Sequence, residues 1–298
     1  MTDPKFVSSP LPGASTGAES AATPMEVKDA AGTAGVLADY ESRAAKNLLG
    51  VGKAVRTTGT ITNETVLGTD SRVRIIDTDL PPWNMICALR LKGRTGTAIG
   101  TGWLAGPKTI VTAGHCVFHS GFFGGWVSEV EVSAGRNDDT FPFGTIKATR
   151  FSALEKWEAS EDPDFDVGCI HLDEALGSKT KVFAVVSPPP ETLADFRVNI
   201  SGYPSDRGAG KQQFFHSNNV LSVSQHRVFY DVDTFGGQSG APVWIHESEN
   251  APPKVVAVHA YGTGGTPFDM GIKANSAPRI TPALFDIIEG WVAEDGGR

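Results

Sequence analysis

Short β-prone runs, each broken after a few residues by Gly, Pro or Asp, recur along most of this sequence. From residue 73 onward they read VRIID, MICALRL, KTIVTAG, VSEVEVSA, GTIKATRF, DVGCIHL, RVNISGY, RVFYDV, APVWI, KVVAVHA and GIKAN. Many short strands separated by turn residues are typical of an all-β sandwich or barrel rather than of alternating βαβ units. The 34 Gly and 19 Pro among 298 residues fit this turn-rich class, and the composition excludes collagen, a coiled coil and full-length disorder.

The N-terminal region has a different composition. Residues 1 to about 35 consist mainly of Ala, Gly, Ser, Thr and Pro, with Phe6 as the single aromatic residue. Such a segment buries too little apolar surface to offset its ordering entropy, so we expect a mobile leader. Residues 36–49 carry apolar side chains at helical spacing and predict a short helix, and the polar residues 50–64 read as a linker.

The last predicted element is a helix. Thr281 is suited to cap its N-terminus and Pro282 to occupy its first turn. One apolar face of this helix is formed by Leu284, Ile287, Ile288 and Trp291. Earlier in the chain, the three prolines at 188–190 indicate a stiff connection between two halves.

Charge and cysteine content exclude several classes of protein. The net charge of −8 argues against binding to a nucleic-acid backbone, which requires a basic surface. No apolar stretch is long enough to cross a membrane, and the first thirty residues lack a Sec-type signal, which leaves cytoplasmic location and export by another route both open. The three cysteines, Cys87, Cys116 and Cys169, are predicted to be buried thiols, although one disulfide pair is also compatible with the sequence.

The first of three chemical motifs is TAGHC at 112–116, directly after a strand-like run. A histidine at a strand end can accept and return a proton near neutral pH, as a general base must. His115 is therefore a candidate base, although a lone histidine in such a turn is more often structural.

The second motif is DFDVGCIHL at 164–172. An aspartate at the start of an apolar strand can be held half-buried, where it orients an imidazole and stabilises its protonated form. Asp166 is favoured over Asp162 and Asp164 because it directly adjoins the apolar run. We interpret His171 as a strand residue without a catalytic part.

The third motif is DTFGGQSGAPV at 233–243. Glycines on both sides of Ser239 permit a sharp turn that exposes a hydroxyl and aims backbone N–H groups at a developing oxyanion. Alone, GGQSG is weak evidence, and Ala241 separates it from the G-x-S-x-G elbow of α/β-hydrolases.

The order of the three motifs is more informative than each alone. His115, Asp166 and Ser239 follow the chymotrypsin order, whereas subtilisins run Asp-His-Ser and α/β-hydrolases Ser-Asp-His. Separations of 51 and 73 residues leave room for the strands of a barrel between successive members. The sequence therefore predicts acyl transfer through a Ser-His-Asp triad, with no cofactor.

These segments resemble chymotrypsin-like serine proteases, and more closely the V8-like glutamyl endopeptidase branch, which LGTDSRVRI at 67–75 and GTGWLAGPKTIVTAGHCV at 100–117 also suggest. The resemblance implies two six-stranded antiparallel β-barrels followed by a C-terminal α-helix. It divides the chain into a mostly disordered leader at 1–65, a first barrel at 66–190 and a second barrel with the helix at 191–298. It also implies that Gly237 and Ser239 supply the oxyanion-hole N–H groups.

Two positions depart from the trypsin pattern. Gln238 stands where trypsins have an aspartate that pairs with the new N-terminus. Gly100 stands where the usual disulfide partner of Cys116 would be. Both departures favour the glutamyl branch, and neither disturbs the triad.

The resemblance further implies an acid-binding S1 pocket. His259 and Thr234 match the histidine and threonine that bind the P1 carboxylate in that branch, and together they can hold it by charge-assisted hydrogen bonds. We therefore expect cleavage after Glu, and more slowly after Asp. In that branch a propeptide is removed, and Glu64 precedes the family-like segment, so self-cleavage after Glu64 is expected to convert a zymogen.

Three alternatives remain open. A metal site could use His115, Cys116 and His119, but Cys116 stands where the H-E-x-x-H motif has its glutamate. A protease-shaped binding module without activity would be expected to lack a triad residue, and none is missing. A protease of other P1 specificity is the third reading. The expected partners are protein or peptide substrates, with no nucleic acid and no membrane. The protein itself is expected to be a monomer.

Overall fold

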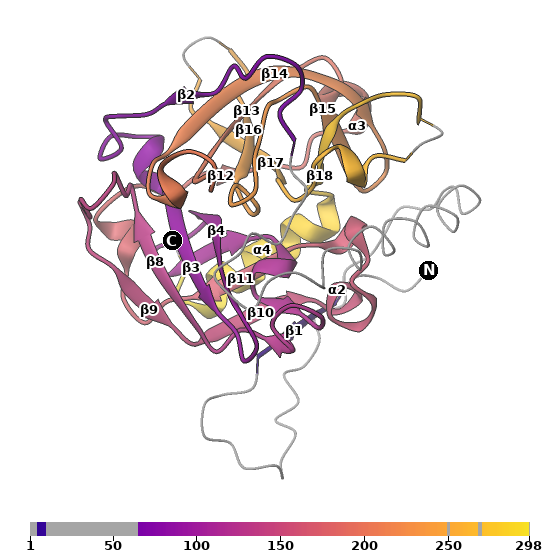
Figure 1. Cartoon of the computed structure of the whole chain (residues 1–298). Coiled ribbons are helices and arrows are strands. Elements are labelled where there is room, and N and C mark those ends of the chain that lie inside the picture. The colour runs from indigo at the N-terminus through magenta and orange to yellow at the C-terminus, as the bar shows by residue number, and fades with distance from the viewer. Residues whose placement is uncertain (1–4, 10–64, 249–250, 268–269, 298) are drawn as a thin grey trace.

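Two barrels of antiparallel strands lie against each other, the first coloured mainly magenta and the second mainly orange (Figure 1). This computed structural model describes residues 5–9, 65–248, 251–267 and 270–297. The helix and linker expected at 36–64 lie outside the described residues.

The first barrel is an eight-stranded sheet in the order β1-β10-β11-β5-β4-β3-β8-β9. Its strands are β1 (Phe6–Ser8), β3 (Ile86–Lys92), β4 (Thr97–Leu104), β5 (Thr109–Thr112), β8 (Glu129–Ala134), β9 (Ile146–Ala148), β10 (Arg150–Leu154) and β11 (Gly168–His171). Only Thr149 separates β9 from β10, and this bent strand pairs with β8 at one end and with β11 at the other. The bend closes the sheet, so that without β1 it is a six-stranded barrel.

The second barrel contains β2 (Val73–Arg74), β12 (Ala184–Val185), β13 (Arg197–Gly202), β14 (Phe214–Val223), β15 (Arg227–Tyr230), β16 (Pro242–Ile245), β17 (Lys254–Val258) and β18 (Asn275–Pro278). Bridges from Ala257 to Arg279 and from Tyr261 to Ser276 join the β17 and β18 sides. The short β2 and β12 add to the outside of this six-stranded core, by pairing with β14 and β17. Both precede residue 191, so they contact the second sheet from the segment expected to form the first barrel, and the boundary itself stays a prediction.

The sequence pattern did not predict two of the longer strands, β4 and β14. β4 contains Gly100 and Gly102, which lower strand propensity, yet a Cβ at Gly102 would lie 2.6 Å from Ile110 Cγ2. Glycine therefore allows β4 and β5 to pack closely. β14 is rich in Ser and Asn and reads as a loop, but it gains strand structure by pairing with β13, β15 and β2. In contrast, the predicted run at 271–275 reaches a strand only at Asn275.

Residues 5–9 of the leader, which the structure describes, contain a short strand. Phe6–Ser8 forms β1, which pairs antiparallel with β10 at the outer edge of the first barrel (Figure 1). The sequence analysis did not predict this strand, because the edge of β10 supplies backbone partners that composition cannot reveal.

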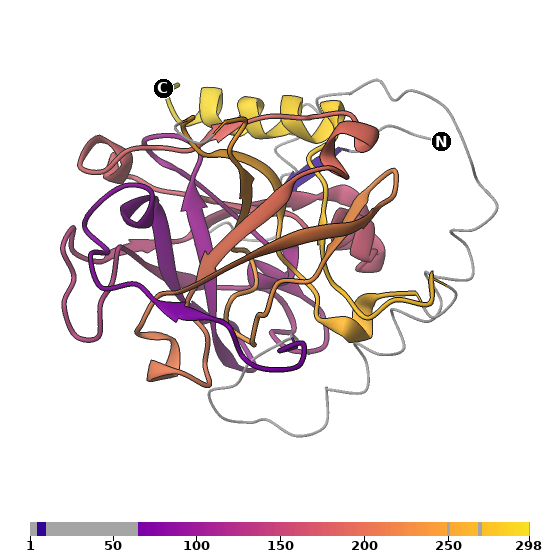
Figure 2. The same ribbon diagram turned by 90° about the horizontal axis from the view of Figure 1, so that it is seen from above.

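The helices are α2 (Glu155–Ser160), α3 (Pro190–Leu193) and α4 (Pro282–Glu294). α4 runs along one side of the molecule (Figure 2) and begins as predicted, with Thr281 Oγ1 accepting the Leu284 N–H at 3.2 Å. Its apolar face is buried. No helix in the described part of the chain is long and apolar enough to span a membrane.

Two short strands lie outside both barrels. β6 (Phe118–His119) and β7 (Gly125–Trp126) form a small separate hairpin after the His115 turn. The three cysteines are free and buried, as expected.

Candidate active site

The His115 turn follows directly from the end of β5. Residues Gly114–Cys116 form a single 3-10 turn that carries His115 into the contact between the barrels. Gly114 is required there because a Cβ would lie 2.6 Å from Trp157 Cδ1. The imidazole is completely buried, with the Trp157 ring 6.2 Å away in an edge-on arrangement.

Asp166 holds His115 by two contacts. One carboxylate oxygen accepts the backbone N–H of His115 at 2.8 Å, and the other lies 2.7 Å from Nδ1. Burial is the largest single effect on the pKa of His115 and lowers it, but the charges and hydrogen bonds of Asp166 and Cys116 together outweigh burial and raise this pKa well above the ordinary value of 6.5. The contact fixes the imidazole so that Nε2 is the nitrogen left to act, and Nε2 has no hydrogen-bond partner among the described residues.

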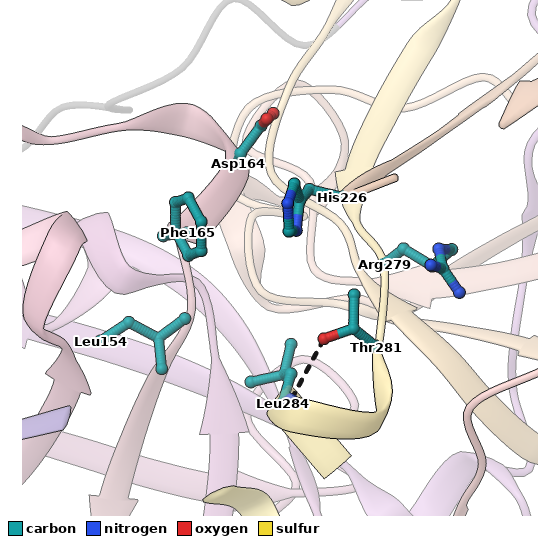
Figure 3. Close-up of a pocket in the computed structure, with 7 residues that line it drawn as sticks. All are labelled: Leu154, Asp164, Phe165, His226, Arg279, Thr281 and Leu284. Atoms are coloured by element: carbon teal, nitrogen blue, oxygen red, sulfur yellow. Dashed lines mark hydrogen bonds between the residues drawn. The ribbon is translucent and has the colours of Figure 1, made fainter. Parts of the chain in front are cut away.

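The two rival aspartates lie elsewhere. Asp162 caps the next short turn by accepting the Asp164 N–H at 3.0 Å. Asp164 lines a hollow with Phe165 and His226 (Figure 3). The hollow is lined by residues of both barrels and of α4. Leu154, Asp164 and Phe165 lie on one side of it, and His226, Arg279, Thr281 and Leu284 lie on the other. Of the three candidates, Asp166 is the one in contact with His115.

The Ser239 turn packs against the His115 turn from the second barrel. The carbonyl of Ser239 accepts the Thr101 N–H at 2.8 Å and faces the Cys116 thiol at 3.7 Å. Thus Ser239 contacts the residue that follows His115 in the chain.

Glycines on both sides of Ser239 give the turn its shape. Gly237 and Gly240 have φ values of +105° and +86°, which other residues seldom adopt. A Cβ on Gly237 would lie 2.6 Å from the Tyr203 carbonyl, so the close approach also requires glycine. Within the described segments, no backbone carbonyl accepts the Gly237 N–H.

The residue that sequence reasoning missed is Tyr261. Its hydroxyl donates to Asp166 at 2.5 Å, and it reaches the same oxygen that contacts His115. Its motif VAVHAYG was noted for His259 alone, and no local signal links it to an aspartate 95 residues earlier.

Thr234 lies in a buried cluster with Asn275 and Thr65. Asn275 Nδ2 lies 3.0 Å from Thr234 Oγ1 and 2.7 Å from the Thr65 carbonyl. Thr65 also accepts the Thr234 N–H at 3.3 Å, and its hydroxyl lies 3.1 Å from that of Thr263. Thr65 is therefore bonded to Thr234, one of the two residues expected to bind the P1 side chain.

His259 is buried behind this cluster. Tyr230 Oη lies 2.5 Å from His259 Nδ1. The main chain of His259 brackets the nucleophile turn, since its carbonyl accepts the Gly240 N–H at 2.7 Å and its N–H donates to Ala241 at 2.9 Å. Tyr230 therefore fixes the ring orientation of His259, while the backbone ties His259 to the Ser239 turn.

The sequence-family model of the trypsin-like peptidase domain matches residues 100–251, just over half of the chain. A glutamyl endopeptidase of Bacillus licheniformis is 36% identical over 233 residues, which cover 76% of this chain and 69% of that protein. This chain belongs to the trypsin-like peptidase family. It is a serine endopeptidase, and its resemblance to the glutamyl endopeptidase branch is confirmed.

Solved structures agree with this membership of the trypsin-like peptidases. A structure described as a Glu endopeptidase in complex with MPD has a TM-score of 0.66 and 28% identity, covering 76% of this chain and 99% of that one. The protease Anisep from Arthrobacter nicotinovorans shares the fold alone, at 16% identity and a TM-score of 0.60, over 74% of this chain and 100% of its own. The predicted chymotrypsin-like all-β fold is confirmed.

A second relative is named an extracellular metalloprotease, from Bacillus subtilis, and is 30% identical over 78% of this peptidase and 71% of its own length. Here the three residues of the metal alternative point to different partners. His115 contacts Asp166, the Cys116 thiol faces the Ser239 carbonyl, and His119 Nδ1 accepts the Gly121 N–H. No group of three or more metal-binding side chains gathers within the described ranges.

His171 of this peptidase also has non-catalytic neighbours. Its Nε2 lies 2.9 Å from Ser152 Oγ, and its Nδ1 lies 3.0 Å from both carboxylate oxygens of Asp295. Asp295 also accepts the Thr109 hydroxyl at 2.8 Å. These contacts tie the end of α4 to the first barrel.

Proposed function

We propose that this serine endopeptidase acts through His115, Asp166 and Ser239 and cleaves peptide bonds after glutamate, and more slowly after aspartate. The observation that carries the proposal is the buried His115–Asp166 contact of 2.7 Å, which leaves Nε2 without a partner beside the Ser239 turn. It supplies the oriented base that a serine nucleophile requires.

The reaction is acyl transfer. Nε2 of His115 takes the Ser239 hydroxyl proton as the oxygen attacks the scissile carbonyl. Asp166 stabilises the imidazolium that forms, which agrees with the raised pKa of His115. His115 then returns the proton to the leaving amine, the acyl-enzyme remains on Ser239, and water hydrolyses it by the same steps in reverse.

Gly237 and Ser239 donate their N–H groups to the oxyanion in this proposal. The positive φ of Gly237 and the Thr101 hydroxyl, which donates to the Gly237 carbonyl at 2.8 Å, hold the Gly237–Gln238 peptide, which lies between the two proposed donors. Pre-set donors need no reorganisation as charge develops. The same hydrogen bonds therefore support both the fold of the turn and its proposed role.

Preference for glutamate follows from the neighbours of Thr234. Its oxygen faces the Asn275 amide at 3.0 Å, so its own proton is left to donate to a P1 carboxylate. His259 is expected to add a second donor from behind the pocket. The relatives named glutamyl endopeptidase support this reading.

Activation by cleavage after Glu64 belongs to the same proposal. Asp233 accepts the N–H groups of Leu67 and Ser71 at 2.6 and 2.9 Å, which anchors the segment that follows Thr65. A cut after Glu64 would create an amino group on Thr65, next to Thr234, where it can attract the P1 carboxylate. Residues 1–64 of the leader are then the propeptide, and the two remaining segments, 66–190 and 191–298, are the two barrels.

Two assays test the proposal. A serine-directed fluorophosphonate should label the wild type and the matched control Ser222→Ala, which changes an unrelated strand of the second barrel, but not Ser239→Ala. Peptides that differ only at P1 should rank Glu above Asp, and both well above Gln, Lys and Phe. If the wild type is labelled but prefers Lys or Phe at P1, the serine protease mechanism stands and the glutamate pocket is refuted. If the wild type is not labelled, the inactive binding module is favoured. Protein and peptide substrates are the expected partners, and a monomer suffices because both barrels lie in one chain.

A further inference from the structure

The leader strand β1 is bound to β10 along its whole length. Phe6, Val7 and Ser8 lie opposite Leu154, Ala153 and Ser152. Two further contacts extend the pairing, since Ser9 N–H donates to the Phe151 carbonyl and Glu155 N–H donates to the Lys5 carbonyl, both at 2.6 Å. Five consecutive leader residues are thus used in the sheet.

Side chains add two specific contacts to this pairing. The Phe6 ring meets the buried Trp291 ring of α4 edge-on, with centroids 6.0 Å apart. Ser8 Oγ lies 2.8 Å from Ser152 Oγ, which in turn contacts His171. The leader strand therefore touches both the barrel and the helix that packs on it.

Without β1, the outer edge of β10 would expose unpaired backbone groups beside an apolar socket at Trp291. An open strand edge pairs readily with any extended peptide. The described chain supplies an occupant for this edge in its own residues 5–9.

We propose that the outer edge of β10 is a peptide-binding site for this chain's own segment Lys5–Ser9, and that it retains the leader noncovalently after the chain is cut at the leader boundary. The cut after Glu64 rests on the proposed function, but the binding site does not. The mature enzyme is then a complex of two pieces, in which the leader covers β10 and Trp291.

The test separates retention from self-processing. In the Ser239→Ala protein, the recognition sequence of an unrelated site-specific protease is inserted after residue 64, and the chain is cut with that protease. Gel filtration followed by mass spectrometry should find the leader fragment together with the barrels. Absence of self-cleavage in the wild type would refute the activation site alone, without affecting this result.

Matched variants identify the contacts responsible. Phe6→Ala removes the ring from Trp291 and Val7→Pro removes an N–H from the middle of β1, so both should release the fragment. Lys5→Ala keeps the backbone bond to Glu155 and should retain it. All three changes lie in the leader, and the melting temperature of the cut protein reports whether the barrels stay folded.

A direct binding measurement completes the test. A fluorescent synthetic peptide of residues 1–12 should bind saturably to protein from which the leader has been removed, and Phe6→Ala should weaken it by about tenfold or more, the value expected for an uncovered phenyl ring. The proposal would be overturned if the leader fragment fails to co-elute with the barrels in the wild-type leader as well as in Phe6→Ala. It would also be overturned if the wild-type peptide shows no saturable binding.

Discussion

Tyr261 and His115 share one carboxylate oxygen of Asp166, the tyrosine hydroxyl at 2.5 Å and the imidazole Nδ1 at 2.7 Å. Tyr261 comes from the second barrel, whereas the other two residues come from the first. The contact therefore ties the orientation of the proposed base to the packing of the two barrels.

Tyr261→Phe should test this positioning role. Loss of the hydroxyl concentrates the charge of Asp166 on His115, so the pKa of His115 should rise further above 6.5. We expect the acidic limb of the pH profile to move to higher pH and kcat to fall about tenfold, as for a lost hydrogen bond to a charged group. KM should change little. A profile that keeps its position would assign Tyr261 a packing role only.

Gly100→Cys should introduce a crosslink at the position where the trypsin pattern has one. A Cβ on Gly100 would lie 3.0 Å from Cys116 Sγ, close enough for a bond between the two residues. We expect the oxidised variant to have two free thiols and to gain roughly 2–4 kcal/mol in the free energy of unfolding. Thiol titration and the melting temperature, each with and without reductant, measure this. A variant with four free thiols after oxidation would show that the geometry does not permit the bond.

Thr234→Val should separate charge recognition from pocket shape. Valine keeps the volume and loses the hydroxyl, so KM for a P1 Glu peptide should rise about tenfold. Thr234→Ser keeps the hydroxyl and should stay within about threefold of the wild type. Equal activity of Val and wild type towards Glu would remove Thr234 from the P1 pocket.

Asp70 should make stability depend on acid pH. Arg72 hydrogen-bonds to it and lowers its pKa from 3.8 to about 2, against the opposing effect of burial. A lowered pKa in the folded state contributes stability that is present above about pH 4 and is lost as the pH falls toward about 2. Asp70→Asn should therefore melt below the wild type near neutral pH and together with it at about pH 2. A constant difference across this range would contradict the ion-pair account.

Thr281→Ala should remove the cap of α4. The Thr281 hydroxyl accepts the Leu284 N–H, and loss of such a cap costs about 1 kcal/mol in the free energy of unfolding. Denaturant unfolding of this variant should be compared with Thr180→Ala, whose hydroxyl bonds only to the next residue's carbonyl. Equal stability of the two variants would show that the helix end is held by other contacts.

The sequence allowed prediction of features that depend on local pattern. The Thr281 cap, the buried thiols and the all-β class follow from residue type and short spacing. His115 and Ser239 could be proposed as site residues because each lies in a turn with distinctive neighbours. The choice of Asp166 over Asp164 followed from the apolar run beside it, and its 2.7 Å contact with His115 agrees with that choice.

Contacts between distant segments were beyond such reasoning. Asn275 reaches the Thr65 carbonyl across 210 residues, and Tyr261 reaches Asp166 across 95. Both depend on barrel closure, which no window of sequence contains. The strand β1 was not predicted for the same reason, because it depends on the free edge of β10 rather than on its own composition.

The helix α4 has a consequence for biosynthesis. Asp295, just beyond it, accepts the hydroxyl of Thr109 across 186 residues, so the first barrel receives this polar partner only after residue 295 has been translated. Chains that have not yet reached Asp295 therefore lack the contacts with Thr109 and His171 that tie the end of α4 to the first barrel.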